Sequence, residues 1–222
     1  MKNMLSRLAA ILCCLCLLGG MAQAASPAHQ ALEKVIDTVL DLIKDPAYAN
    51  PATRDRQRAR IEQEVRTIFD FGEFSLRTVG PRWKTFAPDQ QRAFSEAFAN
   101  LLIPTYVNKI DGYNGERIVY LGEVRSGDGS KVEIRTEVAL NDGRRIPVSY
   151  RMLQKNGAWR VYDVLVENLS LVKNYRTQFQ DILKNGDVSP YRDFFIDWNK
   201  FWAGCGEMTD AGYIQPEEKY IR

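Results

Sequence analysis

The fold is decided by one stretch of the chain, Ile146–Phe179, which reads IPVSYRMLQKNGAWRVYDVLVENLSLVKNYRTQF. Its hydrophobic period changes once, from two residues to about 3.6, as happens where strands lead into a helix. The alternating apolar residues of the first strand are Ile146, Val148, Tyr150 and Met152. Asn156-Gly157 then predicts a tight hairpin, because both turn residues must adopt positive φ. A second strand, Trp159–Val166, gives way to a helix after Ser170.

The same stretch carries a family resemblance. Gly157–Val164 reads G-x-W-R-V-Y-D-V, and Glu167–Phe179 reads E-N-L-S-L-V-x-N-Y-R-x-Q-F. Together these motifs resemble the periplasmic phospholipid-binding proteins of the Mla lipid-transport pathway, also called the toluene-tolerance family, which has a hopanoid-associated branch. Asn168 stands where the family pattern has Gly, and this departure concerns the local turn. The resemblance covers roughly residues 31–186.

Residues 1–24 have the pattern of a secretory signal peptide. Lys2 and Arg7 form a basic start, residues 8–18 are apolar, and Ala22-Gln23-Ala24 is a cleavage motif. The apolar segment is shorter than the roughly 20 residues that span a bilayer. We therefore predict export and a periplasmic location for the mature protein.

The composition of the mature chain argues against several classes of function. Three of the four cysteines leave with the signal peptide, and none follows the small residue of a lipoprotein signal, so we expect neither an internal disulfide nor a lipid anchor. The whole chain has 30 basic and 28 acidic residues. Because Lys2 and Arg7 also leave with the signal peptide, the mature chain has equal numbers of basic and acidic residues. A neutral chain argues against nucleic acid as a partner.

Periodicity predicts that the helices mostly precede the strands. Helices are expected over Ala28–Lys44, from near Thr53, and from Pro88, with a loop between the first two. Lys131–Leu140 alternates cleanly, and Gly-containing turns separate about four strands into an antiparallel meander. The predicted fold is therefore α+β: a curved meander packed against N-terminal helices and one C-terminal helix, similar to an NTF2-like or cystatin-like cone with an apolar cavity.

Domain boundaries follow from the same patterns. Residues 25–186 are expected to form one lipid-binding α+β domain, if the resemblance holds. Residues 187–222 are expected to form an aromatic-rich C-terminal extension to which the resemblance does not extend. An extra helix packed on the sheet, a lid and a partner-docking helix are all open interpretations of that extension.

A large apolar set is the candidate ligand-binding surface. Its members either fill a core or line a cavity between sheet and helices, and the sequence alone does not decide between these alternatives. The resemblance implies a cavity that holds acyl chains. The candidate lining residues are Phe69, Phe74, Val79, Trp83, Phe94, Phe98, Leu101, Leu102, Tyr106, Val132, Ile134, Val138, Ile146, Val148, Tyr150, Trp159 and Val161.

The charged residues indicate a function less clearly than the apolar set does. Arg54, Arg56, Arg58 and Arg60 crowd the start of a helix, where cations oppose the helix dipole; they are either a solvated face or a docking site for an acidic partner. Asp163 is expected on the strand side shared with Trp159 and Val161, bonded to Arg176 or to loop amides. In an NTF2-like enzyme, Asp163 would be the catalytic acid or base.

We expect no catalytic centre, metal site or cofactor. His29 is the only histidine, and neither a Ser-His pair in a pocket nor a His/Cys cluster is apparent. The resemblance implies a soluble carrier that shuttles phospholipid between an outer-membrane lipoprotein–porin complex and an inner-membrane ABC transporter, maintaining outer-membrane lipid asymmetry. Two alternatives stay open besides a filled structural module: a carrier of hopanoid or other polycyclic lipid, and the NTF2-like enzyme.

Overall fold

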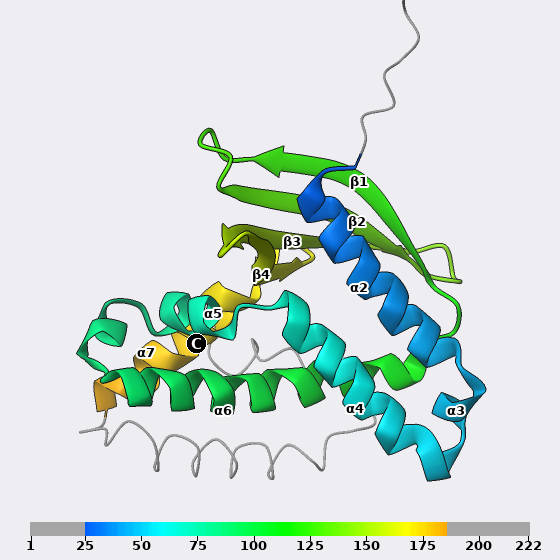
Figure 1. Ribbon diagram of the computed structural model, residues 1–222, viewed down its shortest axis with the longest axis horizontal. Helices are drawn as coiled ribbons and strands as arrows, with labels where there is room; N and C mark the ends of the chain where they lie inside the picture. The colour runs from blue at the N-terminus through cyan, green and yellow to red at the C-terminus, as the bar shows by residue number, and fades with distance from the viewer. Residues whose placement is uncertain (1–24, 186–222) are drawn as a thin grey trace, which may run out of the picture.

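The structure is a computed structural model that describes residues 25–185. The predicted signal peptide, residues 1–24, and the predicted extension, residues 187–222, lie outside the described residues. Within the described part, an antiparallel sheet forms one layer and most helices form another, with α2 running obliquely along the sheet (Figure 1). This is the predicted α+β class.

Six α-helices and two 3₁₀ segments are present among residues 25–185. Prolines stand in the first turn of α2, α3, α4 and α6, where the missing N–H group has no helical partner to lose. Ser26 caps α2 by accepting a hydrogen bond from the backbone nitrogen of His29 at 3.1 Å. The helical segments are α2 (Pro27–Lys44), α3 (Pro46–Ala49), α4 (Pro51–Ile68), α5 (Phe71–Val79), η1 (Gly80–Thr85), α6 (Pro88–Val107), η2 (Asn108–Gly112) and α7 (Leu171–Asn185).

The predicted loop after the first helix is wrong. Residues 46–49 form the short helix α3, and α4 begins at Pro51 rather than near Thr53. Side chains explain why both helices start so close together: Asp45 accepts a hydrogen bond from the nitrogen of Ala47 at 2.8 Å, and Asn50 accepts one from Ala52 at 3.0 Å. Each Asx–Pro pair is therefore a helix start and not only a turn.

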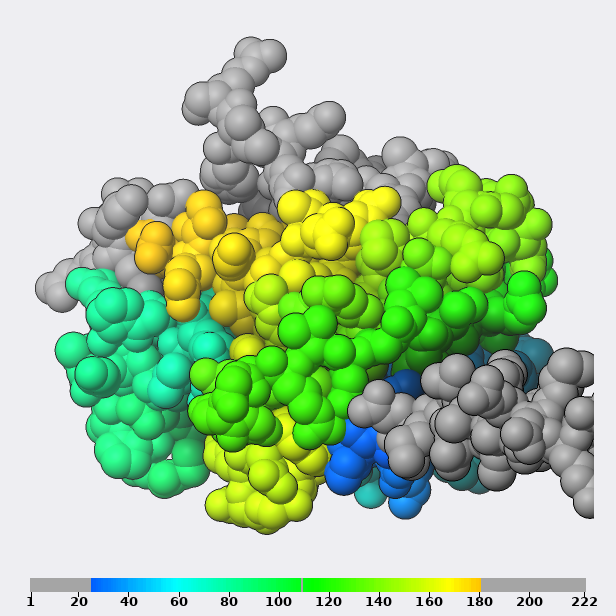
Figure 2. All heavy atoms as spheres, turned by 90° about the horizontal axis from the view of Figure 1, so that it is seen from above, coloured from blue at the N-terminus to red at the C-terminus, as the bar shows by residue number. Residues whose placement is uncertain are grey.

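The sheet is a meander in which every strand pairs antiparallel with its neighbour in sequence. The strands are β1 (Arg117–Arg125), β2 (Lys131–Ala139), β3 (Arg145–Lys155), β4 (Ala158–Val166) and β5 (Leu169–Ser170). About four strands were expected, and the fifth is the two-residue β5, too short to show a period. Figure 2 looks onto the molecule from above the sheet, and strand residues in green and yellow occupy the centre of this view.

Two tight turns frame β4. Asn156 and Gly157 have φ of 51° and 77°, which confirms the predicted hairpin. Glu167 and Asn168 also have positive φ, 52° and 67°, and they turn the chain back into β5. Asn tolerates this left-handed conformation better than most residues, and so Asn168 replaces the expected Gly without disrupting the turn.

A bulge in β4 changes the direction of its side chains. Arg151 pairs with Asp163, but the next residue of β3, Met152, pairs with Val161, so Tyr162 is an extra residue. Before the bulge Trp159 and Val161 point to the sheet face that carries Met152. After it, the even-numbered residues take that face, and the odd-numbered ones point away. The strict alternation that we predicted through this strand is therefore wrong.

Apolar side chains gather in three clusters. The sheet cluster joins α2 to the inner face of the sheet, which we define as the face carrying Ile134, Met152 and Val161. The aromatic cluster joins α5, η1, α6 and α7 around Phe98. A third cluster ties α2 and α3 to α4 and α6. Leu171, at the start of α7, packs against both the sheet cluster and the aromatic cluster, so α7 connects the two layers.

Candidate ligand-binding site

The inner face of the sheet is closed at one end and partly open at the other. At the closed end Val132, Ile134, Met152 and Val161 have at most 2% of their surface exposed. At the opposite end of the same strands, the inward-facing residues Ile118, Val138, Ile146 and Val166 are only half-buried. The described helices thus cover the apolar wall incompletely, and the half-buried residues define what we call the open end.

Two tyrosines of the predicted lining set keep accessible surface. Tyr150, on β3, is half-buried, and burial raises the pKa of its hydroxyl to about 12. Tyr106, on α6, has 37% of its surface exposed, and burial also raises the pKa of its hydroxyl. Both side chains therefore keep surface that is available for contact with a ligand.

The predicted lining residues fall into two groups that the structure does not merge. Those of the sheet cluster are Phe69, Val132, Ile134, Val138, Ile146, Val148, Tyr150, Trp159 and Val161. Those of the aromatic cluster are Phe74, Val79, Trp83, Phe94, Phe98, Leu101 and Leu102. Tyr106 belongs to neither cluster, and its hydroxyl is hydrogen-bonded to that of Tyr175 on α7. Contact of any of these residues with a ligand stays a prediction.

The aromatic cluster is a packed core. Phe74 and Phe98 are fully buried, and their rings meet edge to face at 5.4 Å. Phe98 also meets Tyr175 at 5.2 Å and Phe179 at 5.3 Å, both edge to face. Such contacts leave no free surface on Phe98. Among the predicted lining residues, Val138 and Ile146 of the open end and the half-buried Tyr150 on the same face are therefore the better candidates.

The sequence missed three residues of this region. Ile118 and Tyr120 lie on the inner face of β1, where an extra residue, Leu121, interrupts the alternation and hides the strand period. Leu171 begins α7 and was predicted only as part of the helix after Ser170. Ile118 and Tyr120 are two residues apart, as expected for one face of a strand, but this alternation covers too few residues to predict the strand alone.

Asp163 does not lie on the inner face of the sheet, which corrects our prediction. Because of the bulge at Tyr162, it lies on the sheet face opposite to Trp159 and Val161. Its carboxylate accepts hydrogen bonds from the hydroxyl of Ser170 at 2.7 Å and from the nitrogen of Val172 at 3.0 Å, and it forms an ion pair with Arg151 at 3.3 Å. A loop amide was expected, but Val172 lies in the first turn of α7. Arg176, the other expected partner, instead donates to the carbonyl of Arg77 at 2.8 Å.

The arginines of α4 divide into two kinds. Arg54 donates from Nε to the carbonyl of Tyr48 at 3.1 Å, and Arg58 forms an ion pair with Asp111, so both hold α4 against α3 and η2. Arg56 and Arg60 are exposed, and Arg60 donates to Gln57 at 2.9 Å. The α3 carbonyls and Asp111 therefore explain half of a cluster that opposes the helix dipole, and docking by the arginines stays a prediction.

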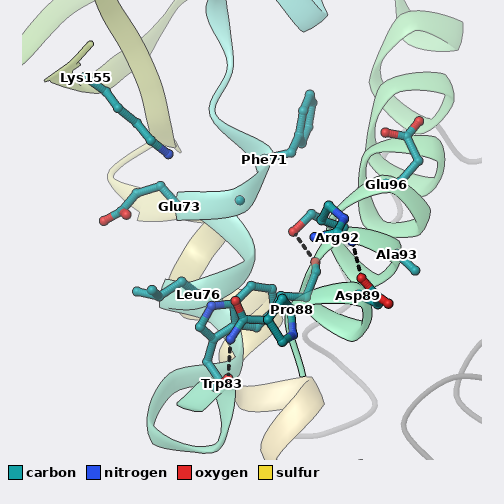
Figure 3. A pocket seen from close by; sticks show the side chains of 13 residues that line it. Phe71, Glu73, Leu76, Trp83, Pro88, Asp89, Arg92, Ala93, Glu96 and Lys155 are labelled. Carbon is teal, nitrogen blue, oxygen red and sulfur yellow. Dashed lines mark hydrogen bonds and ion pairs between the residues drawn. The ribbon is translucent and has the colours of Figure 1, made fainter. Parts of the chain in front are cut away.

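Surface hollows occur away from the open end. One, of about 930 Å³, lies between α5, η1 and α6. Its lining residues include Leu76, Trp83, Glu96 and Lys155 (Figure 3). Only Trp83 of the predicted lining set borders it, and its charged residues are engaged in ion pairs, as between Glu96 and Arg66 at 3.1 Å. A second, of about 670 Å³, lies beside α3 and η2 and includes Arg54. Neither is the predicted cavity.

Two kinds of feature are absent from the part of the chain that the structure describes. Between residues 25 and 185, no three His, Cys, Asp or Glu side chains come close enough to bind a metal ion together. Over the same range, no helix combines the length and the apolar character that crossing a membrane requires.

The fold and the site define a class of protein, an α+β domain in which helices enclose the apolar face of a meander and leave one end open. Within that class, the chain belongs to the MlaC protein family, whose model matches residues 33–191. This match confirms the family resemblance seen in Gly157–Val164 and Glu167–Phe179.

Three known proteins illustrate the relationship. The toluene tolerance protein ttg2D of Pseudomonas putida is 31% identical over 133 residues, which cover 59% of each chain. The intermembrane phospholipid transport system binding protein MlaC of Haemophilus influenzae is 24% identical over 115 residues, 50% of this chain and 54% of that one. The solved structure of a phospholipid-binding protein from Ralstonia solanacearum, in complex with a phospholipid, has a TM-score of 0.62 at 25% identity and covers 72% of this chain and 88% of that one.

A short match to an enzyme also exists. It is 42% identical over 69 residues to a sucrose 6(F)-phosphate phosphorylase of Ilumatobacter coccineus, and it covers 31% of this chain but 13% of that enzyme. The chain spans less than two thirds of the length of each of these curated relatives. The likeness to the Ralstonia structure supports the α+β fold described above.

Proposed function

We propose that this protein is a lipid carrier that holds the acyl chains of a phospholipid at the open end of the inner sheet face. The observation that carries the proposal is the half-buried apolar surface of the open end, formed by Ile118, Val138, Ile146 and Val166. Membership of the MlaC family and the phospholipid in the Ralstonia relative support it.

Energetics explains why such a carrier encloses its cargo. Two acyl chains hold on the order of 30 methylene groups, and each one gains about 0.8 kcal/mol on leaving water. A protein that left many of them exposed would lose the lipid to the nearest bilayer. An apolar wall that is tightly packed at one end and open at the other allows entry while it shields the chains along their length.

The setting proposed for this carrier is the periplasm, reached through the signal peptide of residues 1–24. There it would shuttle phospholipid between an outer-membrane lipoprotein–porin complex and an inner-membrane ABC transporter, maintaining outer-membrane lipid asymmetry. The name of the Haemophilus relative, an intermembrane phospholipid transport system binding protein, supports this setting. Arg56 and Arg60, exposed on α4, are the part of the arginine cluster proposed to dock on acidic partners.

The enzymatic alternative finds no support at Asp163. A catalytic acid or base has to reach the bound ligand, whereas the Asp163 carboxylate lies on the opposite face of the sheet. Its oxygens are engaged by Arg151, Ser170 and Val172. The geometry gives Asp163 the role of holding α7 to the sheet.

Lipid extraction tests the proposal. The mature protein is purified from its native periplasm, and its organic extract is analysed by mass spectrometry. Co-purified diacyl phospholipid is the expected result, and a polycyclic lipid would replace the proposal with the hopanoid carrier. A protein that arrives empty and also takes up no lipid from phospholipid vesicles is not a carrier.

A further inference from the structure

Three hydroxyl groups lie on the apolar inner face of the sheet, on adjacent strands. Tyr120 of β1 stands directly opposite Thr136 of β2, and Tyr150 of β3 lies one inward position further along. Thr136 donates its proton to the carbonyl of Val148 at 2.9 Å. The Thr136 hydroxyl is also a hydrogen-bond partner of Tyr150. Thr136 and Tyr150 thus both have partners within the protein.

The hydroxyl of Tyr120 is the exception. It is buried, and it has no hydrogen-bond partner among the described residues. The ring itself is held in place, with its centre 4.5 Å from that of the His29 ring on α2. Burial, and then the charges of Glu33 and Asp37 together with nearby Tyr150, raise the pKa of Tyr120, so the hydroxyl keeps its proton as a donor. A buried donor without an acceptor is destabilising, and this one lies next to the open end.

The surroundings restrict which acceptor fits. Glu33 and Asp37 of α2 act on Tyr120 electrostatically, and both would repel a phosphate or another anion at this position. Tyr120 also packs against the apolar residues of the sheet cluster. A neutral acceptor attached to apolar chains meets both conditions. In a diacyl phospholipid, that acceptor is the ester carbonyl.

We propose that the Tyr120 hydroxyl donates a hydrogen bond to an acyl-ester carbonyl of the bound lipid, which makes it a polar contact in an otherwise apolar site. This inference rests on the proposed lipid-carrier function and deepens it. The protein then distinguishes ester-linked from ether-linked lipids, because an ether-linked lipid has the same chains but no carbonyl. One neutral hydrogen bond corresponds to a preference of about threefold to tenfold.

A competition experiment tests the inference on the full mature chain. Delipidated protein is incubated with vesicles that contain equal amounts of dioleoyl phosphatidylglycerol and its dialkyl ether counterpart, and the bound lipids are counted by mass spectrometry. Tyr120→Phe removes only the hydroxyl. Tyr162→Phe is the matched control, since that ring lies under the guanidinium of Arg77, at 4.1 Å, in the β4 bulge. Thermal unfolding of each lipid-free variant is measured in parallel.

We expect the wild type and Tyr162→Phe to favour the diester, and Tyr120→Phe to bind both lipids equally. Lipid-free Tyr120→Phe should unfold at the wild-type temperature or above, because it loses an unsatisfied donor. A wild type that loads both lipids equally, or a Tyr120→Phe variant that keeps the preference, overturns the inference while the carrier function stands; an ordered water as the acceptor gives this result. A wild type that loads neither lipid overturns the carrier function as well.

Discussion

The carboxylate of Asp163, on β4, accepts a hydrogen bond of 3.0 Å from the backbone nitrogen of Val172, in the first turn of α7. Its other oxygen accepts from Ser170, whose hydroxyl in turn accepts from the nitrogen of Lys173 at 3.1 Å. Two of the nitrogens at the start of α7 that lack helical partners are thereby satisfied. A side chain of the sheet therefore fixes where the connecting helix begins.

Asp163→Asn should destabilise the protein. The neutral amide keeps the shape of the side chain but weakens its bonds to Ser170, Val172 and Arg151, and hydrogen bonds to a charged group contribute about 1.5–3 kcal/mol. We expect the free energy of unfolding, measured by urea denaturation, to fall by an amount in that range. Asp55→Asn, at an exposed position of α4, is the control and should change it by less than about 0.5 kcal/mol. Equal stability of the two variants would contradict the assigned role.

The turn from β4 to β5 stores backbone strain at Glu167, whose φ is 52°. Asn adopts this conformation more readily, so Glu167→Asn should raise the free energy of unfolding by about 0.5 kcal/mol, whereas Glu167→Val should lower it by about 1–2 kcal/mol. Chemical denaturation of the three proteins side by side gives the ranking. Should Val prove as stable as Glu, the turn does not have the positive φ described here.

Ile146→Glu tests whether the open end of the inner sheet face binds lipid. The residue is half-buried, so a charged side chain there can reach water and the fold should survive, but the carboxylate would lie beside the bound acyl chains. We expect lipid uptake from phospholipid vesicles to fall at least tenfold while the circular dichroism spectrum is unchanged. Ser149→Glu, on the opposite face of the same strand, is the control and should load normally. Normal loading by both variants would remove Ile146 from the site.

Alkaline pH should destabilise the protein through its buried tyrosines. The pKa of Tyr150 is raised to about 12 in the folded protein, compared with about 10 for an unfolded tyrosine. The folded state thus keeps a proton that the unfolded state loses, so this stabilisation is complete below about pH 10 and declines as the pH rises toward about 12. Thermal unfolding temperatures across this interval should fall, and they should fall less steeply for Tyr150→Phe. Parallel curves for the two proteins would argue against a buried hydroxyl at this position.

Much of the fold follows from local patterns that the sequence shows directly. Asn156-Gly157 predicted the β3–β4 hairpin because few other residue pairs adopt its backbone angles. The alternation in Lys131–Leu140 predicted a strand with one buried face, and β2 forms over Lys131–Ala139 with such a face. Pro88 marked the start of α6, since proline is favoured in the first turn of a helix.

Features that depend on how strands pair, rather than on the local conformational preference of residues, were not predicted. Nothing in Trp159–Val166 marks Tyr162 as an extra residue, because a bulge is defined by the partner strand and needs no Gly or Pro. That one residue decided the side on which Asp163 lies. The sequence also could not show whether the apolar residues fill a core or line a cavity. Phe98 and Tyr150, for example, are both aromatic residues on apolar faces. Only the three-dimensional packing shows that the first is enclosed by other rings and that the second keeps accessible surface.

The uninterrupted order of the strands has a consequence for how the molecule forms. Because each of the five strands pairs with its neighbour in sequence, nearly the whole apolar wall is made from contacts between residues close together in the chain. Loop-closure entropy for such pairing is small, and low contact order is associated with rapid folding. The costly closures are those that bring α2 and Phe69 onto the sheet, the latter through its bridge to Val161. The wall can therefore assemble locally, and enclosing it is the slow, long-range step.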